Sequence, residues 1–389
     1  MQKCIIIGIS DKHGQWFPPE VEAAIRCHRV FSGGRRHYEI VRPLLPENAE
    51  WITIIVPLSK VFDQYAQHTE VVIFASGDPL FYGFAATVQR ECKDCDITVI
   101  PSFNSIQLLA HRLNMPYNHL VTVSLTGRPW DGLDKALIEG QSLIGCLTDH
   151  NKTPHQIWQR MTDYGYTNYK MYVGEKLGNE LEERVGVYNQ TYTYSTPNCV
   201  LLEKTSDRNI PFGLPDSEFC LLNGRKKMIT KMPIRLCSLA ALDLVGKKSF
   251  WDVGFCTGSI SIEAKLRFPH LHITAFEVRT EGELLMQQNA RHFGALGITP
   301  VIADFMSTDL SAYPQPDAVF IGGHGGQLLP MVAKIKSVLA TDGCIVFNSV
   351  SEESLELFKE GVTSVGMTWS EVYKLTVDDN NTITILKAQ

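Results

Sequence analysis

Glycines and a carboxylate gather in the last third of the chain, where an apolar run meets a helical pattern. Asp252 lies near the end of the apolar run 248–253, and Gly254, Thr257 and Gly258 follow before the helical pattern begins. Glycines let a backbone approach a ligand closely, and a helix N-terminus offers free N–H groups to carboxylates or phosphates. The Gly-x-x-x-Gly spacing differs from that of dinucleotide-binding turns and of P-loops. The turn therefore predicts a nucleotide-like cofactor of another class.

Two further acids follow in the order that such a cofactor needs. Glu277 comes 25 residues after Asp252, at the end of the run 272–276, where a carboxylate can accept both hydroxyls of a ribose. Asp304 closes the run 299–302, where it can reach an adenine amino group. Each acid alone is better explained as a helix cap or a solvated side chain, but the ordered set is not. The set resembles that of the class I S-adenosylmethionine-dependent methyltransferases, which implies that this cofactor binds Asp252, Gly254, Thr257, Gly258, Glu277 and Asp304.

The first third of the chain carries three strand–turn–helix corners that could also hold a ligand. The segment 75–83 contains Gly77, Asp78 and Pro79, and we expect Asp78 to cap a helix over 80–91 with Pro79 in its first turn. The segment 101–107 contains Ser105, and the segment 32–37 contains the run Gly-Gly-Arg-Arg-His. Each corner alone is also explained by ordinary turn chemistry.

Together these corners resemble the tetrapyrrole methylase family, which holds S-adenosylmethionine between two α/β lobes and methylates porphyrin-like rings. The resemblance implies that Gly77, Asp78, Pro79 and Ser105 bind the cofactor. The Arg-Arg-His run and the segment 124–129 resemble the branch that acts on corrin precursors. The first turn departs from the family pattern, because residues 8–14 lack the Pro-Gly that many members carry.

The two halves in this order resemble the fused precorrin-6Y C5,C15-methyltransferases (decarboxylating) of cobalamin biosynthesis. The segments 228–235 and 320–326 carry the likeness in the second half. The resemblance implies methylation at C5 by the N-terminal half, methylation at C15 by the C-terminal half, decarboxylation of an acetate side chain, and one S-adenosylmethionine site in each half. His324, where relatives have a small residue, is the candidate proton donor for the decarboxylation. The sequence leaves open whether the ring carries cobalt.

Such a substrate carries many carboxylates, so an acidic protein must supply local cations. The formal net charge is −6, and two clusters offer basic side chains: one with Arg35, Arg36 and His37, the other with Lys231 and Arg235, which are spaced i,i+4. Arginine can grip a carboxylate with two parallel hydrogen bonds. We expect both clusters to bind substrate carboxylates; the alternative is that they form solvated faces.

Two other functions compete with this interpretation. An RNA methyltransferase would need a basic, aromatic-rich surface, and the net acidic chain with its short, non-basic tail at 362–389 argues against one. A scaffold with one degenerate half would bind cofactor in only one half. No metal site is expected, and Cys92 and Cys95, a lone Cys-x-x-Cys pair, are interpreted as a surface turn.

Apolar runs alternate with helical patterns along the chain, which predicts an α/β protein. We expect a two-lobed tetrapyrrole methylase domain over 1–206, with lobes at about 1–115 and 116–206, a Pro- and Gly-containing linker over 207–227, and a Rossmann-like, doubly wound S-adenosylmethionine-dependent domain over 228–389. The expected strands are 4–9, 52–56, 70–75, 96–100, 120–125, 143–147, 169–173, 199–203, 248–253, 272–276, 299–302, 317–321, 343–347 and 382–387. The expected helices are 18–28, 80–91, 104–113, 154–163, 232–244, 258–267, 280–293, 326–339 and 351–361.

Composition limits the remaining possibilities. The 389 residues are 44% hydrophobic and 20% charged, as in ordinary globular proteins. Ten scattered cysteines predict a cytoplasmic protein, the lack of a long apolar stretch predicts no membrane partner, and the net charge of −6 argues against a nucleic-acid partner. Its partner is a small-molecule tetrapyrrole, and the family resemblance implies a homo-oligomer.

Overall fold

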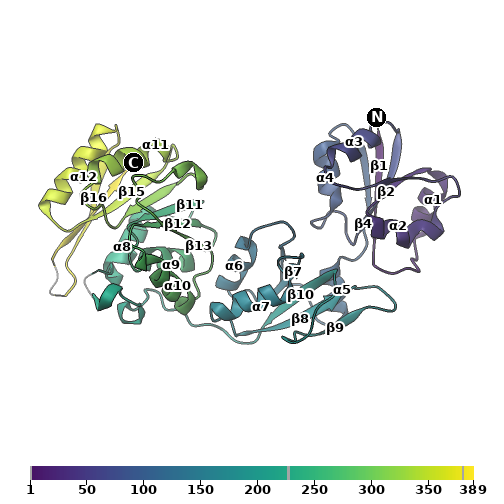
Figure 1. Cartoon of the computed structure of the whole chain (residues 1–389), viewed down its shortest axis with the longest axis horizontal. Helices are drawn as coiled ribbons and strands as arrows, with labels where there is room; N and C mark the ends of the chain where they lie inside the picture. Colours follow the sequence, from purple (N-terminus) through teal and green to yellow (C-terminus); the bar gives the residue numbers. More distant parts are fainter. Residues whose placement is uncertain (1, 226–227, 379–380) are drawn as a thin grey trace. The chain divides into compact units, whose positions relative to one another are not determined.

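The computed structural model describes residues 2–225, 228–378 and 381–389. Contacts between Cα atoms divide the chain into two compact units (Figure 1). Unit 1 comprises Met1–Arg128, Ser142–Trp158 and Tyr169–Thr205, and unit 2 comprises Pro129–Gln141, Gln159–Asn168 and Ser206–Gln389. Three sheets with helices around them make up these units, which agrees with the predicted α/β class.

The first sheet of unit 1 is parallel throughout and has the order β3-β2-β4-β1-β5. Its central strands are apolar on both faces because helices cover both. Its strands are β1 (Lys3–Ile9), β2 (Val30–Gly33), β3 (Glu50–Thr53), β4 (Glu70–Ser76) and β5 (Asp96–Ile100). The helices α1 (Pro19–Cys27) and α2 (Arg35–Val41) pack on one face, and α3 (Ser59–Tyr65) and α4 (Phe84–Glu91) pack on the other.

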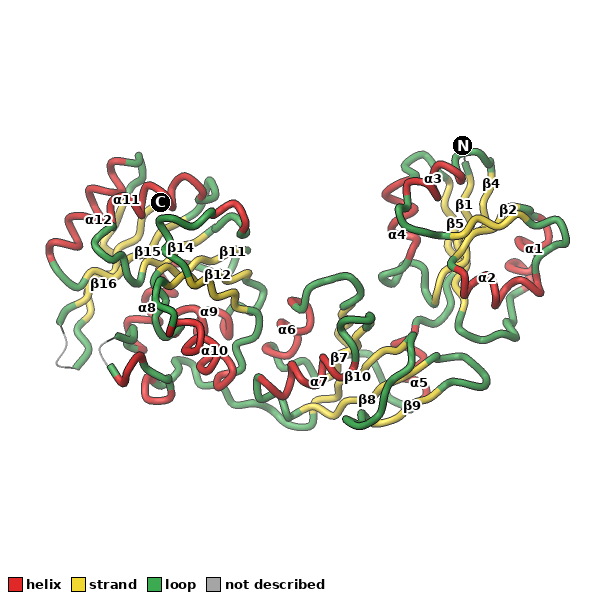
Figure 2. The backbone as a smooth tube through the Cα atoms, in the orientation of Figure 1, coloured by secondary structure: helices red, strands yellow, loops and turns green. Residues whose placement is uncertain are grey.

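The second sheet is mixed and has the order β6-β7-β10-β8-β9, in which only the β6–β7 pair is parallel. Its strands are β6 (Leu120–Ser124), β7 (Leu143–Leu147), β8 (Tyr169–Glu175), β9 (Arg184–Val187) and β10 (Asn198–Lys204). Helix α5 (Ser105–Arg112) packs on this sheet through Ile106 and Leu109. The lobe boundary that we expected near residue 116 therefore falls before α5. Figure 2 shows the strands and helices of both sheets in colour.

The third sheet lies in unit 2 and has the order β13-β12-β11-β14-β15-β17-β16. The first five strands are parallel to one another, and β17 pairs antiparallel with both β15 and β16. The strands are β11 (Ser249–Val253), β12 (His272–Glu277), β13 (Ile298–Ile302), β14 (Ala318–Ile321), β15 (Cys344–Ser349), β16 (Trp369–Leu375) and β17 (Ile383–Ala388). The helices are α6 (Asp131–Ile138), the second half of α7 (Pro154–Asp163), α8 (Met232–Leu242), α9 (Ser259–Arg267), α10 (Glu281–Phe293), α11 (Leu328–Val338) and α12 (Glu352–Ser364).

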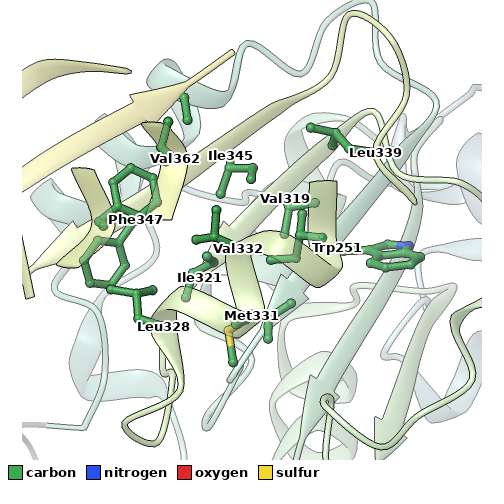
Figure 3. Packing of buried hydrophobic residues seen from close by; sticks show 14 of the residues in the cluster. Trp251, Val319, Ile321, Leu328, Met331, Val332, Leu339, Ile345, Phe347 and Val362 are labelled. Carbon is green, nitrogen blue, oxygen red and sulfur yellow. The ribbon is translucent and has the colours of Figure 1, made fainter. Parts of the chain in front are cut away.

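Apolar side chains cover both faces of this sheet. Trp251, Val319 and Ile345 face Val332 of α11 and Val362 of α12 in one cluster (Figure 3). A second cluster joins the opposite face to α8 and α9. The chain runs outward from β11 to β13 and then returns to β14 on the other side of β11, so strand order reverses between β11 and β14. Ligands of open α/β sheets bind beyond the carboxyl ends of the strands at this place.

Part of the predicted linker belongs to the core of unit 2. Leu214 is fully buried and Phe219 nearly so, and both pack with Phe255, Met286 and other apolar residues of the unit. Short 3₁₀ turns at Asp216–Glu218 and Leu222–Gly224 hold this segment. Residues 226–227, at the predicted end of the linker, lie outside the described residues. None of the described helices has the length and apolarity that a membrane crossing requires.

Candidate cofactor and substrate cavities

Unit 2 contains a cavity of about 880 Å³ beyond the carboxyl ends of β11, β12 and β14. This is the place that the reversal of strand order favours for a ligand. Among the residues proposed from the sequence, those that line it are Lys231, Asp252, Gly254, Thr257, Glu277, Asp304 and His324. Gly258 and Arg235 are not among the described lining residues. The sheet thus brings together three acids, although the first, Asp252, and the last, Asp304, are 52 residues apart in the sequence.

The glycine turn after β11 needs its glycines for two reasons. Gly254 (φ 80°) and Gly258 (φ 75°) have left-handed backbone conformations that other residues adopt only with strain. A Cβ on Gly254 would lie 2.6 Å from the backbone nitrogen of Gly323, and one on Gly258 would lie 2.6 Å from the sulfur of Met286. Gly258 is therefore needed for the conformation of the turn and for its close packing against α10.

Cys256 lies in the same turn with φ 50°, a conformation that costs a non-glycine residue about 1 kcal/mol or more. Its backbone N–H donates to Oε2 of Glu277 at 2.9 Å, and its side chain lines the cavity. Sequence reasoning did not single out Cys256. Its position two residues after Gly254, inside a predicted ligand turn, was the available signal.

Buried carboxyl groups line the inner end of the cavity. Asp252 is 2% exposed, and its Oδ2 accepts a hydrogen bond from the Ser261 hydroxyl at 2.6 Å. Burial, assisted by the negative charge of Glu277, raises the pKa of Asp252 to about 7 although the hydrogen bonds from Ser261 act in the opposite direction. Glu277 is 3% exposed and also accepts from the backbone N–H of Arg279 at 3.0 Å.

Thr257 is buried as well, but the remaining predicted polar side chains of this cavity are more exposed. Asp304 is exposed and accepts from the backbone N–H of Met306 at 3.0 Å. His324 is half-buried, its Nδ1 accepts from the Gly326 N–H at 3.2 Å, and burial lowers its pKa. Lys231 lies 3.8 Å from a carboxylate oxygen of Asp216. Arg279, which sequence reasoning missed, adds a second cation that lines the cavity.

Arg235 has a different place from the one that we expected. Its side chain is fully buried, its Nε lies 3.2 Å from Glu263, and its Nη1 lies 3.1 Å from Asp216. Nη1 also donates to the Thr230 carbonyl at 2.8 Å. Glu263 is buried on α9 and needs a positive partner, and Arg235 on the inward face of α8 supplies it. We therefore correct the predicted substrate-binding role of Arg235 to a structural one.

Unit 1 contains a second cavity, of about 530 Å³, at the carboxyl ends of β1 and β4. Gly77 and Ser105 of the predicted cofactor set and Arg36 and His37 of the predicted substrate set line it. The exposed Arg35 is not among its described lining residues, nor are Asp78 and Pro79. Asp11, from the first turn that departs from the tetrapyrrole methylase pattern, also lines the cavity.

Asp78 and Pro79 shape a turn before the helix. Asp78 Oδ1 accepts from the Leu80 N–H at 2.9 Å, and the Asp78 carbonyl accepts from Phe81 at 3.0 Å. Helix α4 begins only at Phe84, after Gly83, so the prediction that Asp78 caps a helix from residue 80 is wrong. The turn closes on itself first, and it requires glycine at position 83 because a Cβ there would lie 2.5 Å from the Pro79 carbonyl oxygen. Asp78 and Pro79 thereby support the neighbouring Gly77.

Two basic side chains of this cavity meet at Ser76. Arg36 Nη2 donates to Ser76 Oγ at 2.9 Å, and His37 Nε2 lies 2.9 Å from the same oxygen. Arg36 Nη1 also lies 3.1 Å from Asp11. Burial and the positive charge of Arg36 lower the pKa of His37 to about 4, so His37 is neutral near pH 7 and adds no positive charge to the cluster.

The Cys-x-x-Cys pair forms a turn at the end of α4. Cys95 Sγ donates to Gln2 Oε1 at 3.2 Å, and both cysteines are free thiols. Within the described ranges, no three His, Cys, Asp or Glu side chains converge as a metal ion would require.

Comparison with known proteins matches each half to a family. Residues 20–189 match the model of the Tetrapyrrole (Corrin/Porphyrin) Methylases, and residues 223–388 match the model described as Precorrin methyltransferase domain. A Sinorhizobium protein named precorrin-6Y C(5,15)-methyltransferase [decarboxylating] is 30% identical over 359 residues, which are 90% of this chain and 84% of that protein.

Shorter relatives cover one part of the chain. A Salmonella typhimurium protein named cobalt-precorrin-6B C(15)-methyltransferase (decarboxylating) is 35% identical over 34% of this chain and 68% of that protein. A crystal structure titled precorrin-6Y C5,15-methyltransferase from Geobacter metallireducens is 30% identical, covers 46% of this chain and 99% of that one, and has a TM-score of 0.43.

Proposed function

Because this chain belongs to the precorrin-6Y C5,15-methyltransferase (decarboxylating) family, we propose that it methylates a corrin precursor at C5 and C15 and decarboxylates an acetate side chain in cobalamin biosynthesis. The observation that carries the proposal is a pair of cavities, one in each unit, each beyond the carboxyl ends of parallel strands. The similarity to a decarboxylating C(15)-methyltransferase over only 34% of the chain supports C15 chemistry in one half, and we place it in the C-terminal half because residues 223–388 match the precorrin methyltransferase model. C5 methylation then belongs to the N-terminal half.

The cavity of unit 2 fits S-adenosylmethionine, which members of this family use. Bound there, it would supply a methyl group already activated on a sulfonium. Glu277 offers a carboxylate for ribose hydroxyls, Asp304 offers one for the adenine amino group, and Gly254 lets the turn that lines the cavity pack against the backbone of Gly323. These residues would align donor and acceptor, and no protein nucleophile is needed.

We place a second donor site in the cavity of unit 1. Gly77 (φ 60°) and Ser105 line this cavity, and Gly77 has no room for a Cβ because the Cα of Asn104 would lie 2.9 Å away. Ser105 begins α5 behind the Asn104 cap, which fixes the loop that faces Gly77. Equilibrium dialysis with labelled S-adenosylmethionine tests this: two donors bound per chain support the proposal, and one contradicts it.

Substrate carboxylates would meet Lys231 and Arg279 in unit 2 and Arg36 in unit 1. Each of these cations is half paired with an acid, at 3.8, 3.4 and 3.1 Å respectively, so each is oriented yet keeps donors for a ligand. These cations would therefore bind the corrin precursor through the carboxylates at the periphery of its ring. His37, being neutral, would contribute a hydrogen bond and no charge.

His324 is the proton donor that we propose for the decarboxylation. Its Nδ1 accepts from the Gly326 N–H, so in the neutral ring Nε2 carries the proton. When the bond to the carboxyl carbon breaks, CO₂ leaves and the electron pair enters the conjugated ring. The pair then returns to the side-chain carbon, which takes the proton from Nε2 and becomes a methyl group, and the imidazolate left behind recovers a proton from water. Replacement by Gln should slow CO₂ release more than methyl transfer to C15.

Mass spectrometry of a metal-free precorrin substrate after incubation with S-adenosylmethionine tests the whole proposal. The expected product has gained two methyl groups and lost one CO₂. No mass change with either the metal-free or the cobalt-bearing substrate would refute the function. The free cysteines fit the reducing cytoplasm, where we also expect the chain to self-associate.

A further inference from the structure

Ser76 presents an unused hydrogen-bond donor to the cavity of unit 1. It is the last residue of β4, its side chain is exposed, and it lines the cavity beside Gly77. Its Oγ contacts Arg36 Nη2 and His37 Nε2, each at 2.9 Å. Nothing in the sequence analysis singled out Ser76, because the neighbouring Gly-Asp-Pro turn carried the family resemblance.

The direction of both hydrogen bonds follows from their partners. Arginine has only donors, so Arg36 donates to Ser76. The Gly34 N–H donates to His37 Nδ1 at 3.2 Å, so Nδ1 is the acceptor nitrogen and the proton of the neutral ring resides on Nε2. His37 is neutral near pH 7 because burial lowers its pKa to about 4. Ser76 Oγ therefore accepts from Arg36 and from His37, whose ring also donates to the Phe74 carbonyl, and the Ser76 proton cannot be given to either basic neighbour.

No described residue accepts that proton. Because both lone pairs of the Ser76 hydroxyl already accept hydrogen bonds, the hydroxyl can act toward a ligand only as a donor. Arg36 is held in place by Asp11, whose side chain is 10% exposed, at 3.1 Å. The Arg36 side chain remains 40% exposed, and its guanidinium places a positive charge next to the Ser76 hydroxyl. A hydroxyl donor beside an exposed guanidinium matches the chemistry of a carboxylate.

We propose that Ser76 and Arg36 form a carboxylate-binding subsite, with His37 as the positioning residue that fixes the Ser76 hydroxyl as a donor. The inference rests on the proposed function, which provides two sources of a carboxylate. One is a side chain on the rim of the corrin precursor, and the other is the amino-acid end of S-adenosylmethionine. Separate kinetic titrations of the two compounds distinguish them.

The test uses the full-length chain and compares Ser76→Thr with Ser76→Val. These two variants have nearly equal volume and differ in the hydroxyl that the inference requires. Loss of a hydrogen bond to a charged group should raise KM about tenfold in the Val variant, with a smaller change in kcat, while Thr keeps wild-type values. Ser59→Val, at an exposed serine of unit 1 that is not among the described lining residues, is the matched control.

Methyl transfer to C15 and CO₂ release by the other cavity serve as internal controls in the same tube. A rise in KM for the corrin precursor assigns the carboxylate to the substrate, and a rise in KM for S-adenosylmethionine assigns it to the donor. Equal KM values for Thr and Val variants in both titrations would overturn the subsite. If wild-type protein itself makes no C5 product, the proposed function fails, which is a different outcome from unchanged KM values in an active enzyme.

His37→Gln and His37→Ala check the positioning role. Gln can still donate to Ser76, whereas Ala frees the hydroxyl to turn. The Ala variant should raise the same KM as Ser76→Val, and Gln should restore at least half of the lost affinity. An Ala variant with the KM of the wild type would show that His37 does not orient Ser76.

Discussion

The carboxylate of Glu277 is held by two backbone donors and by the side chain of Arg279, and the residue lines the cavity of unit 2. The N–H groups of Cys256 and Arg279 bind one oxygen each, at 2.9 and 3.0 Å, and the side chain is 3% exposed. A buried, pre-oriented carboxylate is suited to accept two hydroxyl groups of a ribose without reorganisation.

Replacing Glu277 with Gln should therefore weaken donor binding in this cavity. We expect a loss of about 10-fold to 100-fold, because hydrogen bonds to a charged acceptor are lost or weakened. Isothermal titration with S-adenosylmethionine measures the affinity, and 13C-labelled methyl transfer measures C15 against C5. Methylation at C5 should persist; equal losses at both carbons would contradict a separate site in unit 1.

Asp252 should make donor binding in unit 2 depend on pH near neutrality. Its pKa is raised to about 7, mainly by burial, so the group is neutral in acid and negative in alkali. A cationic donor should bind more tightly above about pH 7 than below it, with uptake of the donor releasing a proton. Asp252→Asn should flatten this profile; an unchanged profile in the variant would exclude Asp252 as its cause.

The same shift affects stability with the opposite sense. Because the folded-state pKa lies above the ordinary value of about 3.9, charging Asp252 costs more in the folded chain. The free energy of unfolding should therefore decline as pH rises from about 4 to about 7, and Asp252→Asn should remove this contribution. Urea unfolding across that pH range measures it.

At the scale of elements, strands were predictable where they are buried on both faces. The run 248–253 became β11 (Ser249–Val253), all five residues of which are buried. Strand β16 escaped prediction because it lies at the sheet edge and has mostly exposed side chains, with Trp369 41% exposed. Helix α3 escaped prediction because it has only seven residues and buries two, and strand β9 because it has only four residues; β2 and α2 flank the strand–turn–helix corner that we expected at 32–37.

The role of Arg235 could not be predicted from its neighbours in sequence. Helix α8 is apolar nearly all round, so a cation on it lies in the core, but its partner Glu263 is 28 residues away on α9. The i,i+4 spacing of Lys231 and Arg235 correctly predicted a helix at this place. It did not predict that the Arg235 side chain would be buried. Only the packing of α8 against α9 decides which of the two cations meets solvent.

Arg235→Ala should accordingly impair folding more than substrate binding. Removing one member of a buried ion pair destabilises a protein by about 3–5 kcal/mol, and here it leaves Glu263 with only the longer, 3.6 Å contact to Arg267 as a positive partner. Denaturant unfolding of the full-length chain measures the loss. A variant with normal stability but a raised KM for the corrin precursor would restore the substrate-binding role.

At the scale of the whole molecule, we propose that the C-terminal domain begins near residue 206 and not at 228. Leu214 and Phe219 are buried in the cluster that contains Phe255 and Met286, so they belong to the core beneath the glycine turn. The prolines and glycines of this segment predicted a linker because they indicate local turns. The burial of Leu214 and Phe219 depends on residues that are distant in sequence, so composition did not predict it.

Two fragments should differ in stability for this reason. A fragment of residues 206–389 keeps both side chains, and one of residues 228–389 loses the burial of each, about 1.5–3 kcal/mol apiece. The shorter fragment should unfold at a lower temperature in calorimetry and bind S-adenosylmethionine more weakly. Equal melting temperatures would show that the segment is a linker after all.

The central claim is that one chain carries two methyl-transfer sites, and isotope labelling tests it most directly. The full-length protein would be incubated with the corrin precursor and S-adenosylmethionine carrying a 13C methyl group, and the product examined by 13C NMR and mass spectrometry. We predict two labelled methyl groups, at C5 and C15, and loss of one CO₂. A product with a single labelled methyl, from a protein that binds one donor per chain, would contradict the account.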